Sequence, residues 1–399
     1  MKIAVFHNLS SGGAKRALFN NVNFLIKDHE VDIFVPSIAD EDYLPLKDIS
    51  NNLYTFKLKN TVMGSLYSSF KYFPSKISLT DLEKTQKTMA EHVNKEDYDV
   101  IFCEQDKYTM APFFLKYIKK PHVYYCQQPI LSRNEISHNL YKKAGLKINK
   151  DAERIRLKFY SSRMVKIDKK LMSQSKYNVA NSYFSHESIM RAYGINSFVS
   201  YLGVETELFK PMDVIKENFV LSVGACIPEK GFDFIIRSIG RIGEKLRPEL
   251  WIVSDLVNIH WKKYLENLAA QLKVRLRILI LISDDELVKL YNKAMVVVYA
   301  PYLEPFGLVP LEAMSCGTPV VGVKEGGVRE TIINNHTGIL CERDEDDFSK
   351  HITQLVTDDH KSEELGKNSV KVVNEFWTLE DSGKRILSHL NRAINYYDL

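Results

Sequence analysis

Short apolar runs alternate with longer segments of helical periodicity along the whole chain. In the first half the runs are KIAVFH, VDIFV, NLYTFKL, YDVIFC, HVYYC and YNVAN; in the second half they are NFVLSVG, ELWIVS, RLRILILI, MVVVYA, TPVVGV and TGILC. Several are apolar at consecutive positions, which is typical of parallel strands covered by helices on both faces. The alternation therefore predicts an α/β protein with doubly wound sheets.

The pattern restarts near residue 205, between YLGV and a fresh strand. A chain of 399 residues is also too long for one ordinary core. We predict two Rossmann-like domains, residues 1–205 and 206–378, which face each other across a central cleft. A last helix, at about 379–399, is expected to pack back on the first domain. Ligands of such sheets bind beyond the carboxyl ends of the strands.

Composition excludes several classes of function. A net charge of +4 is too small to indicate a nucleic-acid partner. The five cysteines are scattered and lack zinc-ligand spacing, which indicates reduced thiols in the cytoplasm. The sequence has neither a signal-peptide pattern nor an apolar run long enough to span a membrane. We therefore expect a cytoplasmic protein.

Glu304 and Glu312 bracket the segment EPFGLVPLE. Pro305, Gly307 and Pro310 make a single helix across it unlikely. We expect the strand MVVVYA, then a loop, then a helix that begins near Pro310, since proline is favoured in a first turn. Glu304 would lie in the loop and Glu312 in the first turn of the helix, both at the carboxyl edge of the sheet.

This segment combines groups that suit two parts of one ligand. The start of a helix attracts anions, and Gly307 lets a phosphate approach the backbone. Carboxylates accept hydrogen bonds from hydroxyl groups. A molecule with hydroxyls on both sides of a diphosphate is a nucleotide sugar. The alternative is that Glu304 is a loop charge and Glu312 only complements the helix dipole.

The same residues carry a family resemblance. EPFGLVPLEAMSCGTPVVG resembles the E-x7-E signature of retaining glycosyltransferases of family 4, which have the GT-B fold; LYNKAMVVVYAP, GGVRETIINNHTGIL, NSYFSHESIMRAYGI and YLGVETELFKP extend the likeness. It implies that Glu304 contacts the donor sugar and Glu312 the ribose. It also implies donor contacts from the backbone of Phe306, Gly307, Leu308 and Val309, and from the base-binding segment that starts at Ser283.

A second motif concerns the diphosphate. GACIPEKG resembles the family's G-R-x-x-P-E-K-G, so Lys230 is implied as a diphosphate clamp. The alternative is a solvated surface lysine. The arginine of the motif is replaced by Ala225, and the loss of a charged hydrogen bond is worth about 1.5–3 kcal/mol.

The first strand leads into a glycine loop, FHNLSSGGAKRAL. It fits neither the dinucleotide-binding nor the P-loop pattern, so we expect no nicotinamide or ATP cofactor, and no cofactor of any kind. It resembles the family's GGAER loop, in which Gly12 and Gly13 would approach the donor phosphate. Lys15 or Arg16 could replace the charge missing at Ala225. The alternative is a plain tight turn.

Two further residues are candidates for the acceptor side or the cleft. HVYYCQQP resembles a Y-C-H-x-P segment whose histidine lies near the acceptor, and Gln127 stands at that position. His7 ends the first strand beside the glycine loop, although a buried structural histidine is an equally good reading. Asp97 and Asp99 match a D-x-D metal pattern, but they precede a strand and lie at the wrong edge of the sheet. We expect no metal.

Residues 141–176 are strongly basic, with about a dozen Lys and Arg against three acids. A basic amphipathic helix is typical of an anionic membrane surface, and a solvated helix face beside the cleft is the alternative. The apolar residues interleaved with these charges are Leu146, Ile148, Ile155, Leu157, Phe159 and Tyr160.

Together these features predict a glycosyltransferase in which Glu304 and Lys230 are catalytic, and the family resemblance implies that it is a retaining one. It would move a sugar from a UDP- or GDP-sugar to a glycan or lipid-linked acceptor, in cell-surface polysaccharide or glycolipid synthesis. It would work in the cytoplasm, with peripheral contact at the inner membrane face. Two alternatives remain: a non-catalytic nucleotide-sugar-binding scaffold subunit, and another GT-B enzyme such as a nucleotide-sugar epimerase.

Overall fold

The structure, a computed structural model, describes the backbone of residues 1–58, 77–129 and 151–397, without the side chains of 151–161. The chain divides into two compact units. Unit 1 contains the described residues of Met1–Asn134, Asn149–Tyr201 and Glu380–Leu399, and unit 2 contains Leu202–Leu379.

Unit 1 is built on a seven-stranded sheet of order β3-β2-β1-β4-β5-β6-β7, in which every pair is parallel. Its strands are β1 (Lys2–Asn8), β2 (Glu30–Pro36), β3 (Asn52–Phe56), β4 (Val100–Asp106), β5 (His122–Cys126), β6 (Asn178–Ala180) and β7 (Phe198–Val199). Its helices are α1 (Gly13–Leu25), η1 (Leu46–Asp48), α3 (Leu79–Lys95), η2 (Phe113–Lys116), α5 (Asp151–Met172), α6 (Tyr183–Tyr193) and α14 (Leu379–Tyr397).

Unit 2 is built on a six-stranded parallel sheet of order β10-β9-β8-β11-β12-β13. Its strands are β8 (Glu217–Val223), β9 (Glu249–Ser254), β10 (Leu276–Ile280), β11 (Ala294–Tyr299), β12 (Val320–Val323) and β13 (Gly338–Cys341). Its helices are η3 (Pro228–Lys230), α7 (Phe232–Arg241), α8 (Ile259–Gln271), α9 (Asp284–Lys293), α10 (Leu308–Ser315), α11 (Val328–Thr331), α12 (Glu345–Thr357) and α13 (Asp359–Phe376).

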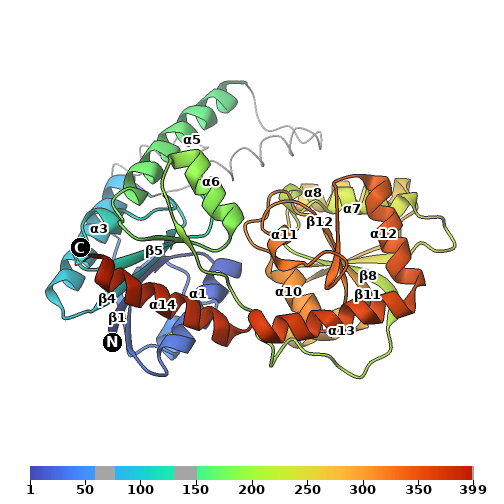
Figure 1. Ribbon diagram of the computed structural model, residues 1–399. Helices are drawn as coiled ribbons and strands as arrows, with labels where there is room; N and C mark the ends of the chain where they lie inside the picture. The colour runs from blue at the N-terminus through green and yellow to red at the C-terminus, as the bar shows by residue number, and fades with distance from the viewer. Residues whose placement is uncertain (59–76, 130–150, 398–399) are drawn as a thin grey trace. The chain divides into compact units, whose positions relative to one another are not determined.

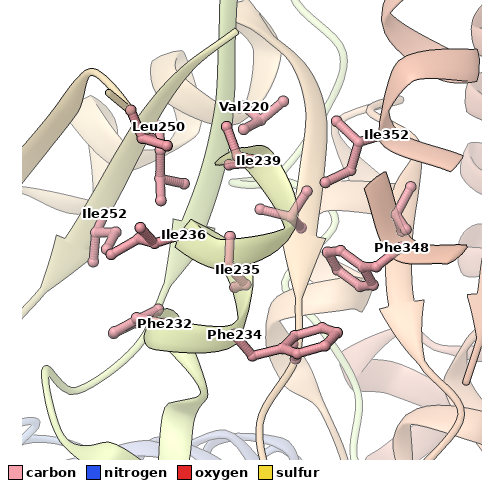
Figure 2. Close-up of a cluster of buried hydrophobic side chains, with 14 of the residues drawn as sticks. Val220, Phe232, Phe234, Ile235, Ile236, Ile239, Leu250, Ile252, Phe348 and Ile352 are labelled. Carbon is pink, nitrogen blue, oxygen red and sulfur yellow. The ribbon is translucent and has the colours of Figure 1, made fainter. Parts of the chain in front are cut away.

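The core of unit 2 shows why the apolar runs form buried strands. Helix α7 turns an almost wholly apolar face toward the sheet and toward α12 (Figure 2). Burial of each such side chain contributes about 1.5–3 kcal/mol, so register errors that expose them are disfavoured. The buried residues labelled there are Val220, Phe232, Phe234, Ile235, Ile236, Ile239, Leu250, Ile252, Phe348 and Ile352.

The last helix, α14, packs on unit 1 (Figure 1). A Cβ added to Gly383 would come within 2.1 Å of the Phe24 ring on α1, so glycine is required for the contact. The Ser382 hydroxyl donates to Asn21 of α1 at 3.3 Å. Farther along α14, the His389 ring hydrogen-bonds the Tyr177 hydroxyl at 3.0 Å.

All twelve predicted strands are present, and the two parallel sheets confirm the predicted α/β fold class. Strand β7 was not predicted, because its two residues are too short to produce a pattern. No described helix is long and apolar enough to cross a membrane.

Each sheet has a topological switch point, where chain order reverses between neighbouring strands. It lies between β1 and β4 in unit 1, and between β8 and β11 in unit 2. The carboxyl ends of the strands at a switch point diverge into loops on opposite faces and leave a crevice for ligands. The segments that follow β1, β4, β8 and β11 are therefore the first places to look for a site.

Candidate functional site

The switch point of unit 2 brings together the two residues predicted to be catalytic. Lys230 lies on η3 after β8, and Glu304 lies in the loop after β11. The Lys230 Nζ donates to the Glu304 Oε2 at 2.8 Å, and both side chains stay partly exposed, at 24% and 21%. Lys230 is therefore not an isolated surface lysine, because it is paired with the other residue predicted to be catalytic.

Helix α10 begins at Leu308 and not near Pro310. Gly307 is the N-cap of the helix and has a φ of 109°, a conformation that residues with a side chain rarely adopt. The chain therefore enters the helix two residues before Pro310. Pro310 is the third helical residue, where its missing N–H costs nothing. The prediction that Glu312 lies in the first turn is therefore wrong, since it is the fifth residue of the helix.

The first turn of α10 consists of Leu308, Val309 and Pro310, which carry no acidic side chain. Its N–H groups have no intrahelical acceptor, so this end of the helix retains its capacity to bind an anion. Phe306, next to the cap, is buried and packs its ring 5.7 Å from that of Trp377. The backbone predicted to hold a phosphate is thus anchored by a buried aromatic residue.

Glu312 is oriented by a tyrosine that sequence reasoning missed. The Tyr291 hydroxyl, on the buried inner face of α9, donates to the Glu312 Oε2 at 2.7 Å. Burial, and secondarily the neighbouring Glu312 charge, raises the pKa of Tyr291 well above its usual value, so it remains a donor. The apolar neighbours of Tyr291 in LVKLYNKAM gave no sign of this contact.

Ser283, predicted to lie near the nucleotide base, has a structural role. It is the N-cap of α9 and forms a capping box: its hydroxyl accepts from the Glu286 N–H at 3.2 Å, and its own N–H donates to the Glu286 carboxylate at 2.9 Å. This reciprocal pair is the usual start of a helix. It accounts for the Ser283 side chain without a ligand.

In unit 1, the glycine loop follows β1 as predicted from the sequence. Gly12 has a φ of 129° and is the N-cap of α1, which begins at Gly13. A Cβ added to Gly12 would meet no described atom within 4 Å, so its positive φ, and not crowding, requires glycine. Because α1 follows β1, its first residues lie at the carboxyl end of β1, next to the switch point of the unit 1 sheet.

Lys15 does not extend from this loop. Its side chain is fully buried, and its ammonium is paired with the Glu41 carboxylate and lies 3.3 Å from the Nε2 of His7. His7 in turn lies 2.9 Å from Glu41. The structure thus gives Lys15 a partner other than the predicted phosphate, and it makes His7 part of the same buried cluster.

Protonation in this cluster follows from burial and pairing. Burial lowers the pKa of His7 to about 4, so the imidazole is neutral; its Nδ1 accepts from the Leu9 N–H at 3.3 Å, and its Nε2–H donates to Glu41. Burial also lowers the pKa of Lys15, although its pairing with Glu41 opposes the shift. Burial alone would raise the pKa of Glu41, but hydrogen bonds with His7 and Lys15 outweigh it and lower that pKa to about 2. Arg16, the neighbouring candidate, donates to the Tyr43 hydroxyl at 3.1 Å.

Gln127 follows β5 and contacts a second residue that sequence reasoning missed. Its side-chain amide lies 3.3 Å and 3.4 Å from the two carboxyl oxygens of Glu104, at the end of β4. Glu104 is fully buried and also accepts from the Gln105 N–H at 3.0 Å. Burial raises the pKa of Glu104 to about 8, and these two hydrogen bonds only partly oppose the shift. The one sequence signal was a carboxylate that directly follows the apolar run VIFC.

The basic segment 141–176 is described only in its last part. Each of the interleaved apolar residues named from the sequence lies outside the described side chains. From 162 onward, α5 turns Met164, Leu171 and Met172 into the core. The cations on its outer face are Arg163, Lys166, Lys169, Lys170 and, just beyond the helix, Lys176. Among the described residues, no group of three His, Cys, Asp or Glu could hold a metal.

Two parallel Rossmann-like sheets in one chain, each with its candidate residues at a switch point, define the GT-B class of proteins. Residues 205–372 match the family glycosyl transferases group 1. These residues are less than half of the chain, and they include EPFGLVPLEAMSCGTPVVG, the segment on which the resemblance to family 4 of the glycosyltransferases rests.

Three comparisons illustrate the relationship. An uncharacterized glycosyltransferase of Methanocaldococcus jannaschii is 33% identical over 175 residues, which cover 43% of this chain and 44% of the relative. The D-inositol 3-phosphate glycosyltransferase of Stackebrandtia nassauensis is 32% identical over 177 residues, covering 39% and 40%. A crystal structure of Anabaena Alr3699/HepE in complex with UDP and glucose superposes with a TM-score of 0.72 at 20% identity, over 98% of this chain and 100% of that one. The matches to these two curated relatives span less than half of either protein's length.

Proposed function

We propose that the protein is a retaining glycosyltransferase that moves a sugar from a UDP- or GDP-sugar to an acceptor hydroxyl. The observation that carries the proposal is the 2.8 Å pair of Lys230 and Glu304 at the switch point of unit 2. It supports the proposal because the ammonium would meet the diphosphate and the neighbouring carboxylate would meet the sugar hydroxyls. Transfer to a glycan or lipid-linked acceptor, in cell-surface polysaccharide or glycolipid synthesis, is the corresponding biological role.

The donor would bind along the carboxyl edge of the unit 2 sheet. The first turn of α10 and Lys230 would take up the charge that grows on the leaving diphosphate, a preorganised electrostatic contribution to catalysis. Glu304 would orient the sugar, and Glu312, held by Tyr291, would accept hydrogen bonds from the ribose hydroxyls. A donor phosphate oxygen would accept the acceptor proton, so that no protein base is needed.

The comparisons support the donor class. The Anabaena neighbour was crystallised with UDP and glucose, and another structure of that protein contains UDP-glucose. The curated relative from Stackebrandtia is a D-inositol 3-phosphate glycosyltransferase. UDP-sugars are therefore the first donors to test, with GDP-sugars next.

Unit 1 would provide the acceptor side. Gln127 is the candidate hydroxyl ligand. Because the amide NH2 group of Gln127 faces the Glu104 carboxyl group, the Gln127 carbonyl oxygen is turned the other way and can accept a hydrogen bond. The enzyme would act in the cytoplasm and touch the anionic inner membrane face through the basic segment 141–176.

The test is a thermal-shift screen of UDP, GDP, ADP and their common sugars, followed by transfer assays on Glu312→Ala. A ligand that binds only the native state raises the unfolding midpoint according to its affinity. We expect one nucleotide class to stabilise the protein, and E312A to fold but lose that response and the transfer. Wild-type transfer by E312A would refute the assignment of the ribose contact. No response to any nucleotide would refute the donor site.

A further inference from the structure

The guanidinium of Arg343 links three neighbouring strand ends of unit 2. Arg343 follows β13, yet its Nε and Nη2 donate to the two carboxyl oxygens of Glu325, beyond β12, at 2.7 Å and 2.8 Å. Its Nη1 donates to the Ala300 carbonyl at 2.9 Å, and Nη2 donates to the Pro301 carbonyl at 2.7 Å, both just beyond β11. Only a planar group with several N–H donors can make this set of contacts.

These contacts hold the root of the loop that carries Glu304. The guanidinium also lies 3.8 Å from the centre of the Tyr302 ring, so one side chain contacts three successive residues, 300–302. The Tyr302 N–H donates to the carbonyl of Glu229 at 2.9 Å. Glu229 directly precedes Lys230, so the two halves of the Lys230–Glu304 pair are joined through the same loop root.

The Glu325 end of the cluster supports the loop from its other side. Glu325 directly precedes Gly326 and Gly327. A Cβ added to Gly326 would come within 2.4 Å of the Glu304 carbonyl oxygen, and one added to Gly327 within 2.3 Å of the Pro305 carbonyl oxygen. The Gly327 N–H donates to the Glu304 carbonyl at 2.7 Å. The loop therefore rests directly on the backbone that Arg343 fixes through Glu325.

We propose that Arg343 is a positioning residue for the donor sugar: it fixes both supports of the loop 301–305 and so holds the Glu304 carboxylate where a sugar hydroxyl can reach it. This inference rests on the proposed function, in which Glu304 contacts the sugar. Glu325 and two backbone carbonyls take four of the five N–H groups of Arg343, so we assign it a role through the loop and not as a phosphate ligand. Its effect should therefore fall on the sugar half of the donor.

The experiment compares the affinities for UDP and UDP-glucose by calorimetry, or for the pair that the screen selects. The variants are Arg343→Ala, Arg343→Lys, Glu304→Ala and, as a matched control, Arg241→Ala. Arg241 is the last residue of α7 and forms an exposed pair with Glu345 at 3.2 Å in the same unit. We expect R343A to lose roughly tenfold more affinity for UDP-glucose than for UDP, the scale of one charged hydrogen bond. R241A should change neither affinity.

Three further readouts separate positioning from general destabilisation. R343K keeps the charge but not the planar donor set, so it should behave like R343A, and millimolar guanidinium should partly restore the sugar preference of R343A. The double variant R343A/E304A should lose no more than E304A alone, because both changes remove the same contact. Glu325→Gln keeps the arginine and should show a smaller loss of the same kind, greater for UDP-glucose than for UDP. It provides the test if R343A does not fold.

The outcomes are distinguishable. Equal losses for UDP and UDP-glucose in R343A, or an unchanged ratio in both R343A and E325Q, overturn the role of Arg343 while E304A still loses the sugar contribution. If E304A also leaves the sugar contribution unchanged, the proposed role of Glu304 fails, and the inference about Arg343 fails with it.

Discussion

Replacing Lys230 with alanine should separate ligand binding from folding stability. The Lys230–Glu304 pair spans 2.8 Å, but its side chains are 24% and 21% exposed, so solvent screens it. Its loss should lower the free energy of unfolding by only about 0.5–1 kcal/mol. A diphosphate that loses the ammonium forfeits a charged hydrogen bond of about 1.5–3 kcal/mol, which is roughly a 10- to 100-fold rise in Kd.

The assay is calorimetric titration of the wild type and K230A with the nucleoside diphosphate that the screen selects, the matching monophosphate and the nucleoside. Lys230 is assigned to the diphosphate, so affinity for the diphosphate should fall most and affinity for the nucleoside should not change. The unfolding midpoint should fall by only about 2–4 °C, as expected for a loss of about 1 kcal/mol in a domain of this size. Wild-type affinity for the diphosphate in K230A would refute the assignment.

Glu304→Gln provides a control with the opposite sign. In the free protein the Glu304 carboxylate neutralises Lys230, so its replacement leaves the ammonium more available to a diphosphate. We expect E304Q to bind the free diphosphate at least as tightly as the wild type and the nucleotide sugar less tightly. A parallel loss for both ligands would show that Glu304 does not act on the sugar.

Three other predictions concern stability and surface charge. Burial holds the pKa of Glu104 at about 8, against 4.5 in the unfolded chain, so between these values the native state retains a proton that the unfolded state loses. The free energy of unfolding should therefore fall by up to about 1.4 kcal/mol for each pH unit by which the pH rises in this range. Glu104→Gln mimics the protonated acid, so its unfolding midpoint should rise relative to the wild type from pH 5.5 to pH 8; an identical pH dependence would contradict this. Gly203→Ala puts a Cβ 2.2 Å from the Thr378 carbonyl oxygen and should cost about 1–3 kcal/mol in urea unfolding, whereas Gly243→Ala, with no atom of the described residues within 4 Å, should cost little. Binding to anionic vesicles at low salt, if it uses the described end of α5, should be lost on charge reversal of the exposed Lys166, Lys169 and Lys170. Vesicles of neutral lipid should bind neither the wild type nor this variant.

The sequence was sufficient for the sheets because the strands are buried on both faces. Runs such as MVVVYA and VIFC must be covered on both sides, and only a parallel sheet between helices does this. Element boundaries were less predictable. The start of α10 depended on the φ of Gly307, and the pattern favoured Pro310 because proline is common in a first turn.

Candidate residues were predictable where they stood in a motif, and their partners were not. Lys230 and Glu304 are 74 residues apart in the chain, yet each lies in a recognisable loop. Arg343 and Glu104 lie in no such motif, and their roles depend on contacts between strands that are distant in sequence. Lys15 shows the opposite case: its place in the glycine-loop motif suggests a phosphate ligand, but its side chain is buried and is paired with Glu41, 26 residues away in the chain.

The Lys230–Glu304 pair also bears on how the product could leave. In the proposed mechanism the donor gives each partner a new contact, since the diphosphate takes Lys230 and a sugar hydroxyl donates to Glu304. After transfer the sugar is gone, so Glu304 is left with a carboxylate that faces a diphosphate and competes with it for the same ammonium. Repulsion between the two anions, and re-formation of the 2.8 Å pair, would then favour release of the nucleotide. The E304Q titration tests this directly, because a variant without that carboxylate should release the free diphosphate more slowly than the wild type, and an unchanged dissociation rate would exclude this role for the pair.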